Sequence, residues 1–171
     1  DFADYINAAS GVTIDLANAS NNTGEALGDT FVSIEGIRGS AFNDILRGDD
    51  VLNGGNAVNE LIGGLGADTI DGGGGFDYAD YRNSAIGLIV SLANSAINTG
   101  EAAGDVFISI EGLIGSDFSD TLIGDGATNF IAGGLGADAI DGGDGIDYAA
   151  YFRSSAGVTV SLANPADNTG E

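Results

Sequence analysis

Aspartates at a fixed place within glycine-rich segments are the residues of this sequence best suited to chemistry. GGLGADTID from Gly63 and GGLGADAID from Gly133 each carry glycine at positions one, two and four, Asp at position six and an apolar residue at position eight. Carboxylate and carbonyl oxygens are the ligands that Ca²⁺ prefers, about six to eight of them at roughly 2.3–2.6 Å. Glycine permits the tight turns that expose carbonyl groups, and the Asp supplies charge. The spacing therefore predicts calcium binding.

The same nine-residue pattern recurs in two blocks, and position six holds only Asp or Asn. The first block adds GSAFNDILR from Gly39, GDDVLN from Gly48, GGNAVNELI from Gly54 and GGGGFDYAD from Gly72; the second adds GSDFSDTLI from Gly115, GDGATNFIA from Gly124 and GGDGIDYAA from Gly142. We align the truncated GDDVLN with the tail of a unit. The predicted metal ligands at position six are then Asp44, Asp50, Asn59, Asp68, Asp77, Asp120, Asn129, Asp138 and Asp147. The two asparagines keep an oxygen but lack the charge, which predicts weaker sites.

Each ion must be shared between turns, because one turn offers too few oxygen atoms. Six turn residues followed by three strand residues predict that two units close one coil and that coils stack at about 4.8 Å. Units two apart then share an edge, such as those at Gly54 and Gly72 or at Gly115 and Gly133, whereas Asp68 and Asp77 lie on opposite edges. The position-eight residues are expected to point inward: Leu46, Leu52, Leu61, Ile70, Leu122, Ile131 and Ile140. The sequence thus predicts an all-β fold, a parallel β-roll or β-helix solenoid.

The two blocks belong to a longer tandem repeat that includes spacers. DFADY from Asp1, DYADY from Asp77 and DYAAY from Asp147 begin related segments 76 and 70 residues apart. Alternating apolar residues predict spacer strands at 12–16, 88–92 and 158–162, and a second strand at 31–37 follows a polar loop. We expect wider coils of one continuous solenoid, because about 35 residues are too few for a separate sandwich. The expected segments are a spacer at 1–38, a block at 39–80, a spacer at 81–114, a block at 115–150 and the start of a third repeat at 151–171.

Composition excludes several functions. Among 171 residues there are 26 acidic residues, four arginines and no lysine, which gives a net charge of −22. This balance disfavours nucleic acid and anionic membrane surfaces as partners. Without His or Cys there is no disulfide, no zinc or copper site of the usual kind and no common nucleophile–base pair. Magnesium suits the pattern less than calcium, because it requires a tight octahedron and retains its waters. No apolar run is long enough to span a membrane.

The quoted nonapeptides resemble the RTX (repeats-in-toxin) family of haemolysin-type calcium-binding repeats, over 39–80 and 115–150. The spacers are similar to those of large repetitive bacterial proteins of this type. The resemblance implies several bound calcium ions, folding on calcium binding, and export by a type I system to the extracellular space or cell surface. It also implies ligation by backbone carbonyl groups in positions one to four, here Gly63, Leu65, Gly72, Gly74, Gly133, Leu135, Gly142 and Asp144.

Two functions are consistent with these residues. The first is a non-enzymatic structural segment of a secreted or surface protein, of the adhesin or extracellular matrix type. The second is a C-terminal secretion or stabilising module of an RTX enzyme or toxin whose catalytic domain lies elsewhere. Paired carboxylates for glycoside hydrolysis are disfavoured because the regular aspartates are explained as ligands, and ice binding because position three holds no ordered array. Self-association and a surface ligand stay open, and both ends fall within a repeat, so we expect a longer natural protein.

Other recurring residues have two interpretations. The spacer acids Asp29, Glu35, Asp105 and Glu111 are either further calcium ligands or solvated acids at strand edges. Tyr81 and Tyr151 follow the last unit of each block, and we expect them to pack against and close the roll rather than to serve as exposed recognition residues.

Overall fold

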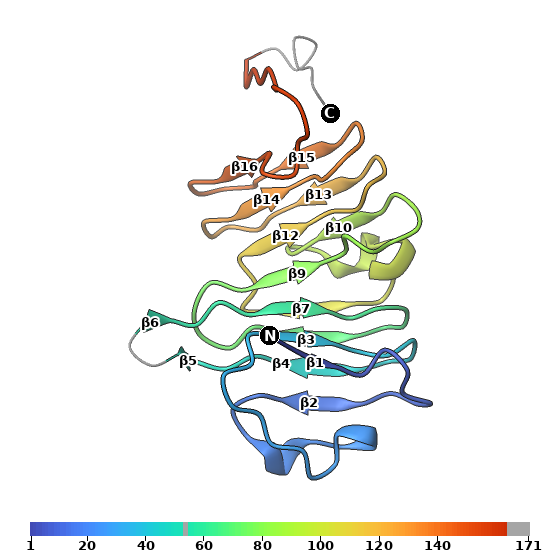
Figure 1. Cartoon of the computed structure of the whole chain (residues 1–171). Coiled ribbons are helices and arrows are strands. Elements are labelled where there is room, and N and C mark those ends of the chain that lie inside the picture. The colour runs from blue at the N-terminus through green and yellow to red at the C-terminus, as the bar shows by residue number, and fades with distance from the viewer. Residues whose placement is uncertain (53–54, 164–171) are drawn as a thin grey trace.

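The protein is a column of short parallel strands stacked in coils (Figure 1). The computed structural model describes residues 1–52 and 55–163. Within these residues one sheet of seven strands runs the length of the column in the order β1-β3-β7-β9-β12-β14-β16. The bounds are β1 Phe2–Asp4, β3 Gly36–Arg38, β7 Glu60–Ile62, β9 Tyr78–Asp80, β12 Gly112–Ile114, β14 Phe130–Ala132 and β16 Tyr148–Ala150.

The opposite side of the column is built from two shorter sheets. One has the order β11-β8-β4-β2 and the other β10-β13-β15 among the described residues. These strands are β2 Thr13–Asp15, β4 Ile45–Arg47, β8 Thr69–Asp71, β10 Ile89–Ser91, β11 Val106–Ile108, β13 Thr121–Ile123 and β15 Ala139–Asp141. All pairs in the column are parallel, so the prediction of an all-β parallel β-roll is confirmed.

Two nonapeptides form one coil, as predicted. Gly112 pairs with Phe130 and Phe130 pairs with Tyr148, which are steps of 18 residues. Strands of three residues are too short to be stable alone, so each depends on the coil above and below. The apolar residues at position eight fill the interior between the sheets: Leu46, Leu61, Ile70, Leu122 and Ile131 are fully buried, and Ile140 is partly buried. The predicted inward position of Leu52 lies outside the described side chains.

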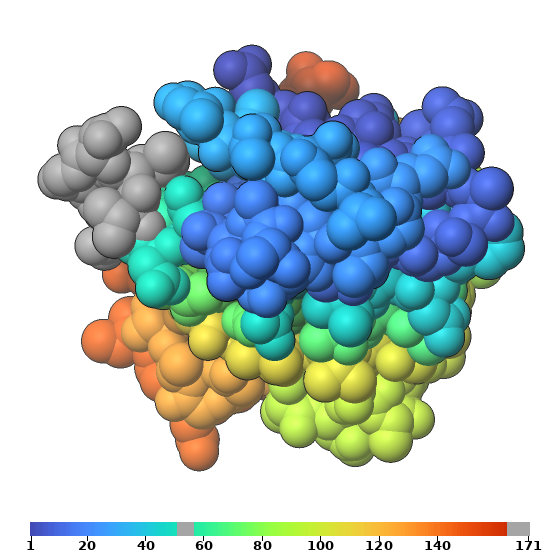
Figure 2. Space-filling view, turned by 90° about the horizontal axis from the view of Figure 1, so that it is seen from below, coloured from blue at the N-terminus to red at the C-terminus, as the bar shows by residue number. Residues whose placement is uncertain are grey.

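The spacers continue the solenoid as wider coils. Phe2 pairs with Gly36 and Tyr78 pairs with Gly112, both across 34 residues. The extra residues form a loop on the side of β2 and β10 with short 3₁₀ turns: η1 Ala19–Asn21, η2 Gly24–Ala26, η3 Ser95–Ile97 and η4 Gly100–Ala102. In Figure 2 the first spacer (blue) spreads over one end of the column. Within the described residues, none of these turns has the length or hydropathy of a membrane-spanning helix.

Two predicted spacer strands differ from the structure. The segment 31–37 is not one strand, because Ser33 has a left-handed φ of 55° and only β3 follows it. In the second spacer the equivalent Ser109 (φ 49°) separates β11 from β12, so the chain turns between the two sides of the column there. The strands at 12–16 and 88–92 are confirmed as β2 and β10. At 158–162 no strand is assigned, and Val158, Val160 and Leu162 are exposed.

The alignment of GDDVLN with the tail of a unit is wrong. The amide of Gly48 donates to the Asp71 carbonyl at 2.9 Å, just as that of Gly124 donates to the Asp141 carbonyl at 2.8 Å. Gly48 therefore begins the unit that ends at β7, and the six extra residues lie between Asp49 and Asn59. They form the antiparallel pair β5 Val51–Leu52 and β6 Gly55–Asn56, which projects from the column (Figure 1). The predicted unit start at Gly54 lies outside the described residues.

Candidate calcium sites in the glycine-rich turns

The glycine-rich turns lie along the two edges of the column, between the sheets. In GGLGADTID the second and fourth residues, Gly64 and Gly66, have φ of 97° and 139°, which side chains rarely adopt. A Cβ on Gly64 would lie 2.3 Å from the carbonyl oxygen of Ser40 in the neighbouring coil. Glycine is therefore needed here for both dihedral angle and space, and successive turns pack backbone against backbone.

Position-six side chains form a ladder along each edge. The amide of Asp44 donates to Asp68 Oδ1 at 2.9 Å, and the amide of Asn59 donates to Asp77 Oδ1 at 2.7 Å. The second block repeats this arrangement from Asp120 to Asp138 and from Asn129 to Asp147, at 3.0 and 2.9 Å. Units two apart in sequence thus share an edge, as predicted. One carboxylate oxygen of each of these aspartates is used to align neighbouring coils.

The second carboxylate oxygen has no partner in two of these residues. Asp68 and Asp77 are 1% and 0% exposed, and their Oδ2 atoms accept no hydrogen bond. Burial raises the pKa of Asp68 to about 7 and that of Asp77 to about 6, because the charged form is poorly solvated. A buried carboxylate oxygen without a donor is costly unless a cation binds it. This feature fits a bound metal ion.

Backbone carbonyl groups converge on the same places as the position-six oxygens. A Cβ on Gly39 would lie 2.4 Å from Asp44 Oδ2 and 2.6 Å from the Gly63 carbonyl oxygen. The carbonyl oxygens of Gly72, Gly133 and Gly142 occupy the equivalent places over Gly48, Gly115 and Gly124. The structure therefore places four of the predicted position-one carbonyl groups beside a position-six side chain. The position-three carbonyl groups of Leu65, Gly74, Leu135 and Asp144 stay predictions.

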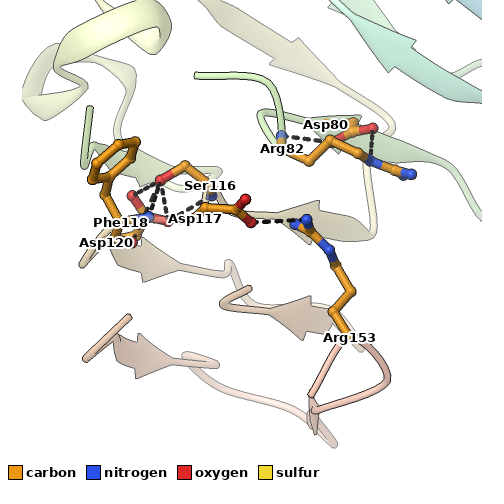
Figure 3. A network of polar contacts seen from close by, with 7 residues as sticks. All are labelled: Asp80, Arg82, Ser116, Asp117, Phe118, Asp120 and Arg153. Atoms are coloured by element: carbon orange, nitrogen blue, oxygen red, sulfur yellow. Dashed lines mark hydrogen bonds and ion pairs between the residues drawn. The ribbon is translucent and has the colours of Figure 1, made fainter. Parts of the chain in front are cut away.

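The two GS turns differ from the glycine-rich ones. The Ser116 amide and hydroxyl donate to Asp120 at 2.7 and 3.0 Å (Figure 3). Ser40 donates to Asp44 in the same way. Asp44 and Asp120 occupy position six like the other aspartates, but their carboxylates already have hydrogen-bond donors within their own turns. They have less to gain from an ion than Asp68 and Asp77. Figure 3 also shows Arg153 bound to Asp117 at 2.8 Å, a link between the third repeat and the second block.

The remaining predicted ligands have local roles. Asn59 Oδ1 accepts the Asp49 amide at 3.0 Å, and Asn129 Oδ1 accepts the Asp125 amide at 2.8 Å, so both asparagines brace their own turns. Asp50 is not at position six. It is exposed at the start of the β5–β6 insertion, where its Oδ1 accepts the Gly74 amide at 3.0 Å. Asp138 and Asp147 are half-buried at the end of the column.

The spacer acids continue the two ladders, which the sequence interpretation left undecided. Asp105 is fully buried, and its Oδ1 accepts the Asp68 amide at 2.9 Å. Glu111 Oε2 accepts the Asp77 amide at 2.9 Å. Both take the place that a position-six residue holds elsewhere. The signal in the sequence is the repetition of GD and SIEG in both spacers, at Asp29 and Asp105 and at Glu35 and Glu111.

Tyr81 closes the first block. It is 3% exposed, packs edge-on against Phe107 at 6.5 Å between ring centroids, and donates its hydroxyl to Asp105 Oδ2 at 2.6 Å. Tyr5 makes the equivalent bond to Asp29 in the first spacer. The packing role predicted for Tyr81 is consistent with these contacts, whereas Tyr151 is only half-buried.

A metal site in these turns would need carbonyl groups as well as acidic side chains. Across residues 1–52 and 55–163, no three acidic side chains meet in one group able to hold a metal ion. A calcium ion in these turns would be held by one or two side-chain oxygens together with carbonyl groups, which is the oxygen-only set that calcium takes. The fully buried Asp68 and Asp77 would supply charge, and the glycine turns would supply the carbonyl groups.

Comparison with known protein families finds four copies of the RTX calcium-binding nonapeptide repeat, at residues 46–79 and 114–149. Comparison with curated proteins finds no match. The matched residues contain Asn59, Asp68 and Asp77 of the first block, the four position-six side chains of the second block, and the carbonyl groups of Gly63, Gly72, Gly133 and Gly142. The chain is thus a calcium-binding repeat segment, built around RTX calcium-binding nonapeptide repeats.

Proposed function

We propose that the chain is a structural segment of a secreted or cell-surface bacterial protein, of the adhesin or extracellular matrix type, and that it folds on binding several calcium ions. The observation that carries this proposal is the pair of buried carboxylate oxygens, Asp68 Oδ2 and Asp77 Oδ2, which have no donor. They destabilise the metal-free fold and become favourable contacts once an ion is present.

The charge of the chain supports coupling between calcium binding and folding. A net charge of −22 opposes compaction through self-repulsion, and bound cations reduce it. The fold has few other means of stabilisation, since its strands are two or three residues long and the chain has no cysteine. Metal ions between the coils would then act as the cross-links.

An extracellular location is supported by the family and by the ion. RTX repeat proteins are typically secreted by bacteria, and weak oxygen-only calcium sites suit the high calcium concentrations outside cells. The repeated spacers support an extended structural role, because the strands of each spacer continue the seven-stranded sheet. No catalytic family is matched, and the buried acids Asp68, Asp77 and Asp105 are explained by the ladders.

The test is a calcium titration of the purified chain followed by far-UV circular dichroism and calorimetry. We expect little β signal after removal of calcium with a chelator, a cooperative rise as millimolar calcium is added, and binding of several ions per chain. An identical spectrum with and without the chelator, together with no binding heat, would overturn the proposal. Sequencing the flanking coding region separates an adhesin with many more repeats from a module attached to a catalytic domain.

A further inference from the structure

We propose that an additional calcium site lies between the turn Gly72–Asp77 and the spacer turn Ser109–Glu111, with Asp77 Oδ2, the Glu111 carboxylate and the Ser109 carbonyl oxygen among its ligands. One side of this site lies outside the matched repeats, which end at residue 79 and resume at 114. The inference rests on the proposed function, because it extends the same chemistry into the spacer.

The backbone register places the spacer turn where a nonapeptide turn would be. The amide of Gly72 donates to the Ile108 carbonyl at 2.9 Å, as that of Gly48 donates to the Asp71 carbonyl. Ser109 therefore occupies position one of the next turn, and three residues, Ser109 to Glu111, replace the usual six. Glu111 directly precedes β12, just as Asp77 directly precedes β9. It is the position-six residue of this shortened turn.

Ser109 presents its carbonyl group as a glycine does in the regular turns. A Cβ on Gly72 would lie 2.2 Å from the Ser109 carbonyl oxygen and 2.7 Å from Asp77 Oδ2. At Gly39 the corresponding neighbours are the Gly63 carbonyl oxygen and Asp44 Oδ2. Ser109 has a φ of 49°, an uncommon value for a residue with a side chain. The same convergence of oxygen atoms thus recurs, although the turn Ser109–Glu111 contains no glycine.

An unpartnered side-chain oxygen points into this convergence. Asp77 is 0% exposed; its Oδ1 accepts the Asn59 amide from the neighbouring coil, and its Oδ2 accepts nothing. The longer Glu111 side chain accepts the Asp77 amide at 2.9 Å, which holds a second carboxylate beside the first. Two carboxylates and a carbonyl group that lie together without a cation destabilise a metal-free fold. The same oxygen atoms are suitable ligands for a hard divalent ion.

The test compares Glu111→Gln with Glu60→Gln. Gln at 111 keeps an oxygen that can accept the Asp77 amide but removes the negative charge. The hydrogen bond between the coils therefore survives, and calcium binding at this site is weakened. Glu60 is the control, because its Oε2 lies 3.0 Å from the Arg82 guanidinium, which already serves as its cation. With calcium counted by equilibrium dialysis and calorimetry, we expect Glu111→Gln to bind one ion fewer than the natural chain and Glu60→Gln to bind the same number.

The outcomes separate this inference from the proposed function. Calcium binding by the natural chain with an unchanged number of ions in Glu111→Gln would overturn the additional site alone, whereas absence of binding by the natural chain would overturn both. If Glu111→Gln fails to fold in calcium, a crystal structure of the natural chain grown with calcium decides. Anomalous density between Asp77 and Ser109 supports the site, and density only between nonapeptide turns overturns it.

Discussion

Asp68 and Asp77 carry charge where water does not reach. Each uses one oxygen to accept an amide from the adjacent coil and leaves the other without a donor. Ser40 and Ser116 supply such donors to Asp44 and Asp120. Aspartates at the same place in the sequence pattern therefore differ in whether both carboxylate oxygens accept hydrogen bonds. A single hydroxyl at position two distinguishes a carboxylate that is satisfied by its own turn from one that depends on a cation.

Asp68→Asn is expected to change stability in opposite directions with and without calcium. In the metal-free protein it removes a buried unpartnered charge and should stabilise the fold by about 1–3 kcal/mol. In calcium it removes a charged ligand and should lower the thermal midpoint. The measurement is thermal denaturation of both proteins in chelator and in calcium. Asp71→Asn is the control, because Asp71 belongs to the same unit but faces Arg47 at 3.6 Å at the surface, where ion pairs contribute little. Destabilisation of Asp68→Asn under both conditions would contradict the ligand role.

The stability of the metal-free protein and its affinity for calcium should depend on pH in opposite directions. Burial raises the pKa of Asp68 from 3.8 to about 7, with Asp105 and Asp44 adding to the rise, and raises that of Asp77 to about 6, with Glu111, Asp49 and Asp50 adding. The folded state therefore binds more protons than the unfolded state between about pH 4 and 7, so metal-free stability should fall as pH rises through this range. Calcium competes with these protons, so its affinity should increase over the same range.

Chemical denaturation of metal-free protein at pH 5 and pH 8, and calcium calorimetry at both values, check this dependence. Asp68→Asn serves as the comparison, since it should flatten both curves. Greater metal-free stability at pH 8 than at pH 5 would be inconsistent with buried, unpartnered carboxylates.

At the scale of elements, the turn rather than the strand determines the repeat. Each strand contributes three residues and one inward apolar side chain, whereas the turns vary widely in length and sequence. They include glycine-rich turns, GS turns, the short Ser109–Glu111 turn and the turn that contains β5 and β6. The strands before and after each of them keep parallel register in the long sheet. The column therefore tolerates insertions at its edges, provided that the residues next to the strands are kept.

Replacement of residues 48–59 by GDGATN, the sequence of the equivalent turn at 124–129, should leave the fold intact. The six extra residues leave the column between Asp49 and Asn59, so their removal should change the thermal midpoint in calcium by roughly 2–4 °C, or about 1 kcal/mol. Deletion of the six residues Gly63–Asp68 is the matched control and should abolish folding. The exchange also removes Asp50, so an unchanged calcium count would show that Asp50 is not a ligand.

The sequence predicted the coil and its ligand edges because both follow from strict spacing. Position eight identified the buried Leu61 and Ile131, and position six identified both ladders. The register of GDDVLN was missed because six residues beginning with glycine resemble part of a unit, and only long-range pairing shows that Gly48 matches Gly124. The place of Asp105 and Glu111 in the ladders was left open because their turns lack the glycine pattern. Left-handed Ser33 and Ser109 break a segment whose composition alone favours a strand.

At the scale of the whole molecule, the column has little to hold it together apart from contacts between adjacent coils. Repeat structures of this kind gain stability from each neighbouring interface, and a coil without a neighbour leaves its apolar side chains exposed. Val12 and Ile14, and Leu88 and Val90, lie in coils that pair with the next coil and are buried. With a charge of −22 distributed along the column, every interface also brings like charges together.

These two features predict that folding responds to specific coordination and not to ionic strength. Sodium chloride at high concentration screens repulsion but provides no ion for Asp68 Oδ2 or Asp77 Oδ2, so it should compact the metal-free chain only slightly. Calcium should reduce the radius of gyration to that of the folded column at far lower ionic strength. Magnesium carries the same charge as calcium but requires a tighter octahedron and keeps its waters, so it is the matched control and should be much less effective. Small-angle X-ray scattering across the three titrations measures the difference. Equal compaction by magnesium and calcium would show that the aspartates act through net charge, whereas compaction by calcium alone assigns the stability of the column to ions held between its turns.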